Sequence, residues 1–191
     1  MAETEEAVRR FLEGEEEAFD RIVRRWDRKV YNLAWRMLGN REDAQDVTQE
    51  TFLSIFKSIK NLRDPGRFST WLYQITLNHC RARWKSRASN LALEDSLSSG
   101  AGEEGENPSS ALSAPAKADS LEAMDLIRKA LAGLSEDHRT ALILKEYMGL
   151  SLEELARVMG CPLSTAKSRL YHGLREVQQN LIRLGIKPRA Q

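Results

Sequence analysis

The stretch SLEELARVMGCPLSTAKSRLYHGLREV, residues 151–177, carries the strongest fold signal in the chain. Ser151 and Glu154 have the spacing of a capping box, in which each side chain accepts a hydrogen bond from the other residue's backbone N–H, and they predict a helix start. Gly160 predicts the end of that helix, and apolar residues spaced by three and four predict another over 165–184. Two such helices around a turn glycine predict a helix-turn-helix.

The second helix of this pair has an apolar side and a polar, basic side. The residues expected to face inward are Leu163, Ala166, Leu170, Leu174 and Val177. The residues expected to point outward or to flank that surface are Thr165, Lys167, Ser168, Arg169, Tyr171 or His172, and Arg175. Hydroxyl, ammonium and guanidinium groups bind base edges and phosphates, so this surface predicts duplex DNA binding. A helical hairpin whose basic surface contacts only proteins remains the alternative.

The whole-chain charge excludes several classes of protein. With 191 residues, 29 Lys+Arg and 28 Asp+Glu, the net charge of +1 excludes a histone-like protein and an acidic chaperone. The sequence has no apolar run of about 18 residues, and its acidic N-terminus resembles no secretion signal, so we expect a cytoplasmic protein without membrane insertion. Cys80 and Cys161 match no metal-binding or disulfide spacing and are expected to be reduced thiols.

Charge counted by segment divides the chain into three parts. Residues 1–88 and residues 121–191 each have a net charge of +3, whereas residues 89–120 have a net charge of −5. The acidic segment is rich in Ser, Ala and Gly, and its few large apolar groups cannot offset the entropy of ordering. We therefore expect two domains, 1–88 and 120–191, joined by a flexible acidic linker over 89–119.

Both flanking segments have helical periodicity and show no sustained two-residue alternation. The helices expected in the first domain cover about 4–13, 15–38, 42–60 and 70–87. The second domain is expected to hold helices at about 120–132 and from Ser135 to Gly149, followed by the helix-turn-helix pair. The predicted fold class is all-α, with two small helical domains and a four-helix helix-turn-helix unit at the C-terminal end.

An aromatic segment precedes a basic one in the first domain. FSTWLY, residues 68–73, is followed by Asn78 and by Arg81, Arg83, Lys85 and Arg87. Aromatic rings beside a basic strip are typical of surfaces that bind single-stranded nucleic acid. Equally, Phe68, Trp71 and Tyr73 could belong to the core, with Trp71 and Leu72 in particular as packing residues, and the basic residues could belong to a solvated helix end.

The helix expected over 42–60 has an acidic polar side. Asp43, Asp46, Gln49 and Glu50 cluster there. Because DNA would be repelled, this side is a plausible docking surface for a protein, with an ordinary solvated helix face as the alternative.

No catalytic arrangement is visible. The three histidines are scattered and adjoin no carboxylate cluster, and no Ser–His or Cys–His pairing, glycine-rich phosphate loop or set of metal ligands is found. We therefore expect no enzymatic activity, no cofactor and no metal.

Three segments in order resemble the bacterial sigma factors of the extracytoplasmic-function group. They are DAQDVTQETF at 43–52, FSTWLY at 68–73 with Asn78, and residues 152–177, which include TAKSRL at 165–170. Ser164, Ala166 and Ala82 depart from the residues common in that group. The departures concern promoter preference and leave the class intact.

The resemblance implies a role for each segment. Polymerase docking would involve Asp43, Asp46, Gln49, Glu50 and Leu53. Contact with the −10 element and a base flipped out of it would involve Phe68, Ser69, Thr70, Trp71, Asn78, Arg81, Arg83 and Lys85. Contact with the −35 element would involve Thr165, Lys167, Ser168, Arg169, His172 and Arg175.

The implied partners are core RNA polymerase, promoter DNA and an anti-sigma protein, and the free chain would be a monomer. A helix-turn-helix regulator that is not a polymerase subunit is the alternative. A receiver-type regulator is disfavoured because residues 1–88 show no α/β pattern.

Overall fold

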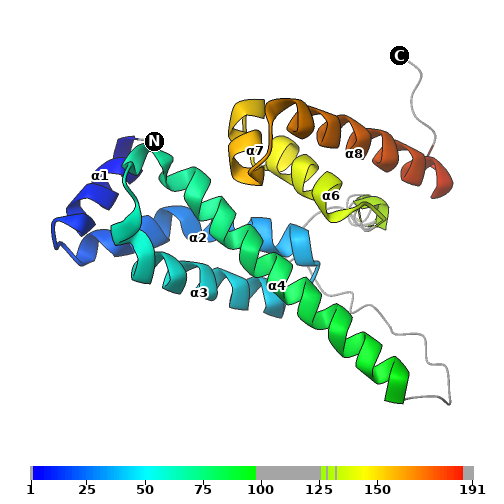
Figure 1. Ribbon diagram of the computed structural model, residues 1–191, viewed down its shortest axis with the longest axis horizontal. Helices are drawn as coiled ribbons and strands as arrows, with labels where there is room; N and C mark the ends of the chain where they lie inside the picture. The colour runs from blue at the N-terminus through cyan, green and yellow to red at the C-terminus, as the bar shows by residue number, and fades with distance from the viewer. Residues whose placement is uncertain (1, 98–125, 128, 132, 187–191) are drawn as a thin grey trace, which may run out of the picture. The chain divides into compact units, whose positions relative to one another are not determined.

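The computed structural model describes residues 2–97, 126–127, 129–131 and 133–186 (Figure 1). Every element in these ranges is a helix, which confirms the predicted all-α class. The chain divides into two compact units, Met1–Pro108 and Ser109–Gln191, and each has buried apolar residues of its own.

The N-terminal unit consists of α1 (Ala2–Leu12), α2 (Glu17–Leu38), α3 (Arg41–Ser58), the 3-10 turns η1 (Ile59–Asn61) and η2 (Pro65–Arg67), and α4 (Phe68–Leu97). α2, α3 and α4 pack against one another, and α1 covers one end of α2 (Figure 1). Ile22, Leu33, Ile55, Leu72 and Leu77 are fully buried where these helices meet. Their three- and four-residue spacing is the pattern that predicts helices in the sequence.

The turn between α2 and α3 sets where the acidic side of α3 begins. Gly39 ends α2 in the left-handed region at φ 70°, and its N–H donates to Trp35 O at 2.7 Å. A side chain is disfavoured in this conformation, whereas glycine adopts it freely. Asn40 then caps α3 because its Oδ1 accepts from the Asp43 N–H at 3.0 Å.

The C-terminal unit begins its described part with helical residues at 126–127 and 129–131. It continues through α6 (Glu136–Leu142), the π-helical turn η3 (Ile143–Tyr147), α7 (Leu152–Met159) and α8 (Leu163–Arg183). The Met148 N–H donates to Ile143 O at 3.1 Å, five residues back, so the predicted helix ends on a widened turn before Gly149.

Helix α4 is longer than the sequence predicts. It extends to Leu97, beyond the predicted helix end at residue 87, so the first residues of the expected linker are helical. The composition of the whole acidic segment conceals Leu91-Ala92-Leu93-Glu94, which are good helix formers. A helix that is already nucleated extends through such residues at little cost. The later part of the expected linker lies outside the described residues.

Helix α8 buries a narrower stripe than predicted. Ala166, Leu170 and Gly173 are buried, whereas Leu163 and Leu174, which were expected to face inward, are exposed. Gly173 has no side chain and lies against α6, so the contact is centred on the 166/170/173 line. Leu163 and Leu174 lie at the edge of that line.

Candidate nucleic-acid interface

Helices α7 and α8 form the predicted helix-turn-helix. The Glu154 N–H donates to Ser151 Oγ at 3.1 Å and the Ser151 N–H donates to Glu154 Oε2 at 2.8 Å, which completes the capping box. Gly160 ends α7 in the left-handed region at φ 62°, and Ala156 is buried at the helix crossing. Local hydrogen bonds thus hold both ends of α7 and direct the chain into α8.

The outward surface of α8 is polar and basic. Lys167, Ser168, Tyr171, His172 and Arg175 are exposed. Thr165 and Arg169 are half-buried. The surface that the sequence assigns to DNA therefore exists on one helix, with two of its members partly covered.

Two residues of that surface, Arg169 and His172, contact side chains of helix α6. Arg169 Nη2 lies 2.6 Å from Asp137 Oδ2, so its guanidinium is already paired with a carboxylate. The His172 ring stacks on His138 with centroids 6.0 Å apart, and His138 Nδ1 lies 3.0 Å from Glu176 Oε2. No local pattern in the sequence points to Asp137, His138 and Glu176, because their partners are about 30 to 40 residues away along the chain.

A nearby arginine anchors the same helix. Arg139 is half-buried and donates through Nη2 to Leu134 O at 3.2 Å. Burial lowers its pKa, and the charge of Glu136 opposes that shift. Arg139 therefore fixes the start of α6, on which the Asp137 carboxylate lies.

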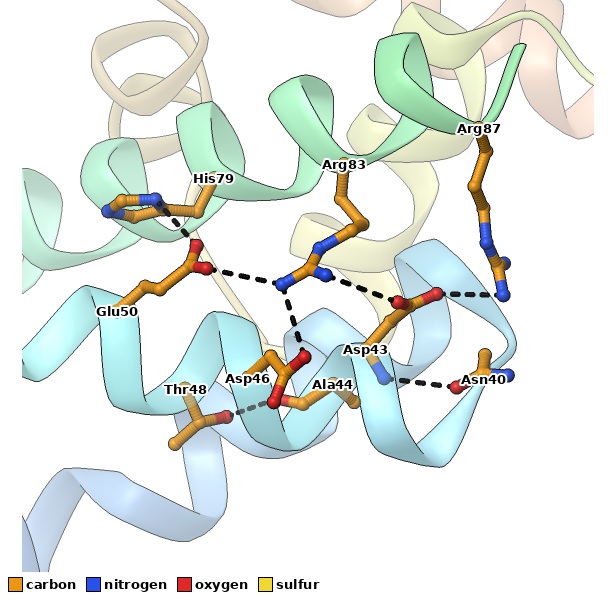
Figure 2. A network of polar contacts seen from close by, with 9 residues as sticks. All are labelled: Asn40, Asp43, Ala44, Asp46, Thr48, Glu50, His79, Arg83 and Arg87. Carbon is orange, nitrogen blue, oxygen red and sulfur yellow. Dashed lines mark hydrogen bonds and ion pairs between the residues drawn. The ribbon is translucent and has the colours of Figure 1, made fainter. Parts of the chain in front are cut away.

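In the N-terminal unit, α3 and α4 are joined by a network of ion pairs (Figure 2). Arg83 Nη2 lies 3.3 Å from Asp46 Oδ2 and 3.1 Å from Glu50 Oε1, and its Nη1 lies 3.7 Å from Asp43 Oδ1. Arg87 Nη2 lies 2.8 Å from Asp43 Oδ2. Residues predicted to contact polymerase are therefore paired with residues predicted to contact DNA or to belong to the basic strip.

Two histidines adjoin carboxylates, contrary to the sequence-based expectation. His79 Nδ1 lies 3.2 Å from Glu50 Oε2, its Nε2 lies 2.9 Å from Ser54 Oγ, and His138 pairs with Glu176. These residues come from different helices, so their proximity has no local signal in the sequence. Ser54, His79 and Glu50 are linked in the same way as the nucleophile, base and acid of a hydrolase triad. Such a triad also uses backbone N–H groups near the serine as an oxyanion hole, whereas the N–H groups around Ser54 lie in the middle of α3 and are used within the helix.

The acidic side of α3 is mostly exposed to solvent. Asp46, Gln49, Glu50 and Leu53 are exposed, and Leu53, at 59%, is unusually open for a leucine. Asp43, by contrast, has only 14% of its side chain exposed. An exposed leucine among carboxylates fits a protein contact better than a purely solvated face.

The aromatic segment lies mostly in the core. Phe68 is 1% exposed and packs edge-on against Trp26 at 6.1 Å, and Tyr73 is buried as well. Direct base contact by Phe68 is therefore not available in this structure, because the apolar segment opens α4 and packs against α2. Trp71 is half-buried beside Phe68 at 6.3 Å and remains the accessible ring.

The polar members of the predicted −10 set differ in exposure. Asn78 and Lys85 are exposed, whereas Ser69, Thr70 and Arg81 are half-buried. The structure thus leaves Asn78 and Lys85 as the exposed members of this set on α4, with Trp71 half-buried.

Two further observations concern the described residues only. Within the ranges the structure covers, no three His, Cys, Asp or Glu side chains converge to form a metal site. Among the same helices, none is both long and apolar enough to cross a bilayer.

The fold, with a helix-turn-helix in the C-terminal unit and an exposed basic surface on α8, is typical of helical DNA-binding proteins. Residues 22–90 match the family model of Sigma-70 region 2, and residues 124–177 match that of Sigma-70, region 4. The RNA polymerase sigma-H factor of Pseudomonas aeruginosa is 32% identical over 185 residues, which cover 93% of each chain. The ECF RNA polymerase sigma factor SigW of Bacillus subtilis is 31% identical over 179 residues, covering 91% of this chain and 94% of SigW.

Solved structures share the fold. CnrH, in complex with the cytosolic domain of CnrY, aligns with a TM-score of 0.71 at 20% identity, covering 95% of this chain and 98% of CnrH. The sigma factor RpoE of Bartonella quintana, in complex with the anti-sigma factor NepR, aligns with a TM-score of 0.65 at 22% identity, covering 86% of this chain and 96% of RpoE.

The chain therefore belongs to the ECF RNA polymerase sigma factors. It is a sigma factor that binds RNA polymerase and recognises promoters, and the alternative of a regulator outside the polymerase is not favoured. The families that match are initiation factors and not enzymes.

Proposed function

We propose that the two units divide promoter recognition between them. The C-terminal unit binds the −35 element as duplex through α8, and the N-terminal unit docks on core polymerase through α3 and binds the −10 element through α4. The chain performs no chemistry of its own and works in the cytoplasm.

The exposed basic surface of α8 carries the proposal for the −35 element. A helix held by a capped partner helix and a turn glycine can enter a major groove without reorganisation. Lys167 and Arg175 are exposed and can bind guanine edges or phosphates, and Ser168 can bind either bases or phosphates. Thr165 and His172 flank this surface. Because Arg169 is paired with Asp137, it contributes only if DNA displaces that carboxylate.

The open residues of α4 support the proposal for the −10 element. Trp71 supplies an accessible ring for stacking, and Asn78 and Lys85 supply donors beside it. Stacking an extruded base on an aromatic ring offsets part of the few kcal/mol that opening the duplex costs. Ser69, Thr70 and Arg81 complete the surface around them.

The acidic side of α3 supports the docking proposal. Asp46, Gln49, Glu50 and Leu53 combine charge with an exposed apolar group, which is the usual composition of a protein contact. A second protein partner is an anti-sigma factor. RpoE, which shares this fold, is seen with the anti-sigma factor NepR, and this supports the proposal.

The −35 assignment is tested by changing one exposed lysine. We expect Lys167→Ala to reduce initiation from a −35-dependent promoter roughly five- to tenfold in a reconstituted assay, because one base or phosphate contact is lost. The dependence of promoter binding on salt should also weaken by about one unit of log–log slope. Affinity for core polymerase should not change.

Arg183→Ala is the matched control, since it removes one exposed positive charge from the far end of the same helix. If Lys167→Ala and Arg183→Ala reduce initiation equally, α8 acts through its general charge and the assignment of its recognition surface is wrong. A loss of polymerase affinity in Lys167→Ala would instead place this surface against the polymerase.

A further inference from the structure

Arg83 lies among three carboxylates, although the resemblance to sigma factors implies that it contacts the −10 element. We propose that Arg83 is a positioning residue that holds Asp46 and Glu50 in the arrangement that polymerase recognises, and that it is not a DNA ligand. This inference rests on the docking role proposed above for α3.

One nitrogen of Arg83 contacts two carboxylates of α3. Arg83 Nη2 lies 3.3 Å from Asp46 and 3.1 Å from Glu50, which are one helical turn apart on α3. Carboxylates four residues apart repel each other, and a guanidinium placed between them removes that repulsion. Both keep about half of their side-chain surface open, at 55% and 47%, so each can also accept from a partner.

Arg83 itself is held in place from both sides of the network (Figure 2). Its Nη1 lies 3.7 Å from Asp43, and the Asp43 carboxylate is held by Arg87 at 2.8 Å. At the other end of the network, His79 Nδ1 lies 3.2 Å from Glu50. A planar guanidinium can bind three carboxylates at once, whereas a lysine ammonium is a compact charge that cannot bridge the distance between these carboxylates.

DNA binding would conflict with the present position of the Arg83 side chain. Only 28% of the Arg83 side chain is exposed, and its two terminal nitrogens point toward the carboxylates of α3 (Figure 2). Reaching a phosphate would mean leaving three negative partners, and the same carboxylates would repel the phosphate. Lys85, two residues further on, is exposed and carries no such cost.

The experiment compares polymerase affinity with promoter opening. Arg83→Gln and Arg83→Lys are titrated against core polymerase by fluorescence, and open-complex formation is then measured with the polymerase in saturating excess. We expect Arg83→Gln to weaken polymerase binding about tenfold and Arg83→Lys to fall between it and the wild type. Saturating polymerase should restore promoter opening. Arg28→Gln, the same change at an exposed arginine of α2, should leave both quantities unaltered.

A double-mutant cycle separates positioning from a general effect on folding. If Arg83 acts through Asp46, Arg83→Gln should weaken binding much less in an Asp46→Asn background than in the wild type. Circular dichroism and thermal unfolding show whether each variant is folded at the assay temperature, and Arg83→Lys retains the charge if Arg83→Gln does not fold.

Two outcomes would overturn the inference. Normal polymerase affinity with defective opening at saturation would make Arg83 a DNA ligand, and tighter polymerase binding would mean that Arg83 shields the carboxylates instead of positioning them. Failure of the docking role itself is recognised separately: Asp46→Arg would then leave polymerase binding unchanged, whatever Arg83 does.

Discussion

Gly173 is the residue whose role is clearest from its surroundings. It is buried in the interior of α8, where glycine usually costs about 1 kcal/mol relative to alanine. A Cβ at this position would lie 3.1 Å from His138 O and 3.1 Å from Leu142 Cδ1. The missing side chain therefore allows α6 to approach α8 closely enough for the Asp137–Arg169 and His138–Glu176 contacts.

We expect Gly173→Ala to lower the free energy of unfolding of the C-terminal unit by about 1–3 kcal/mol, because the backbone carbonyl of His138 cannot move aside as a flexible side chain could. The gain in helix propensity offsets only part of this. Urea unfolding followed by circular dichroism measures the change, with Gln178→Ala at an exposed position of α8 as the control. An increase in stability would show that the two helices separate without cost.

Phe68 shows at the same scale why composition misleads. Its neighbours in sequence are those of a nucleic-acid-binding segment, yet its ring is in the core against Trp26. An aromatic side chain offers the same surface to a base and to another ring, so its residue type alone does not distinguish the two environments.

At the scale of elements, the pairing of α6 with α8 determines which charges are available to DNA. Asp137 holds Arg169, and this contact competes with any phosphate for the same guanidinium. The two helices also share the stacked rings of His138 and His172. The basic surface of α8 is thus partly neutralised by its neighbour, as α4 is by α3.

We expect Asp137→Asn to free Arg169 and to strengthen binding to duplex DNA at low salt. The log–log dependence of affinity on salt should steepen by about one unit, because one more phosphate can be neutralised. Glu146→Gln is the matched control, since it removes one exposed negative charge from the same unit and leaves the Asp137–Arg169 pair in place. Fluorescence anisotropy at several salt concentrations measures both effects. An unchanged slope would mean that Arg169 does not reach DNA when released.

The extension of α4 to Leu97 belongs to the same scale. Composition averaged over the acidic segment predicts disorder from its first residue, but a helix stops where local residues no longer support it. Leu91 and its neighbours support it, so the boundary follows the local sequence and not the average.

At the scale of the whole molecule, each unit has a core of its own. Ile22, Leu33 and Ile55 are buried in the N-terminal unit, and Ile143, Leu144 and Leu155 are buried in the C-terminal unit. Units of this size can fold alone, though with modest stability.

We therefore expect the segments 1–97 and 126–186 to fold as separate chains, because each unit has buried apolar residues of its own. Each should give helical circular dichroism and a cooperative thermal transition. In the full-length protein, Gly173→Ala should shift the transition of the C-terminal unit only. A fragment that stays unfolded while the intact chain folds would show that its core needs the other unit.

The sequence by itself determined the helices, the capping box at Ser151 and Glu154, the helix-turn-helix and the sigma-factor class. The helices and the capping box depend on spacings of three and four residues and on caps, which are local and can be read along the chain. The sigma-factor class depends on the resemblance of three segments of the chain to that family. The tertiary structure alone decided which charges are free: Arg83 is paired with three carboxylates of α3, Arg169 is paired with Asp137, and Phe68 is buried. The physical reason is that pairing depends on which faces of two distant helices meet, and helical periodicity says that a face exists without saying what it will contact.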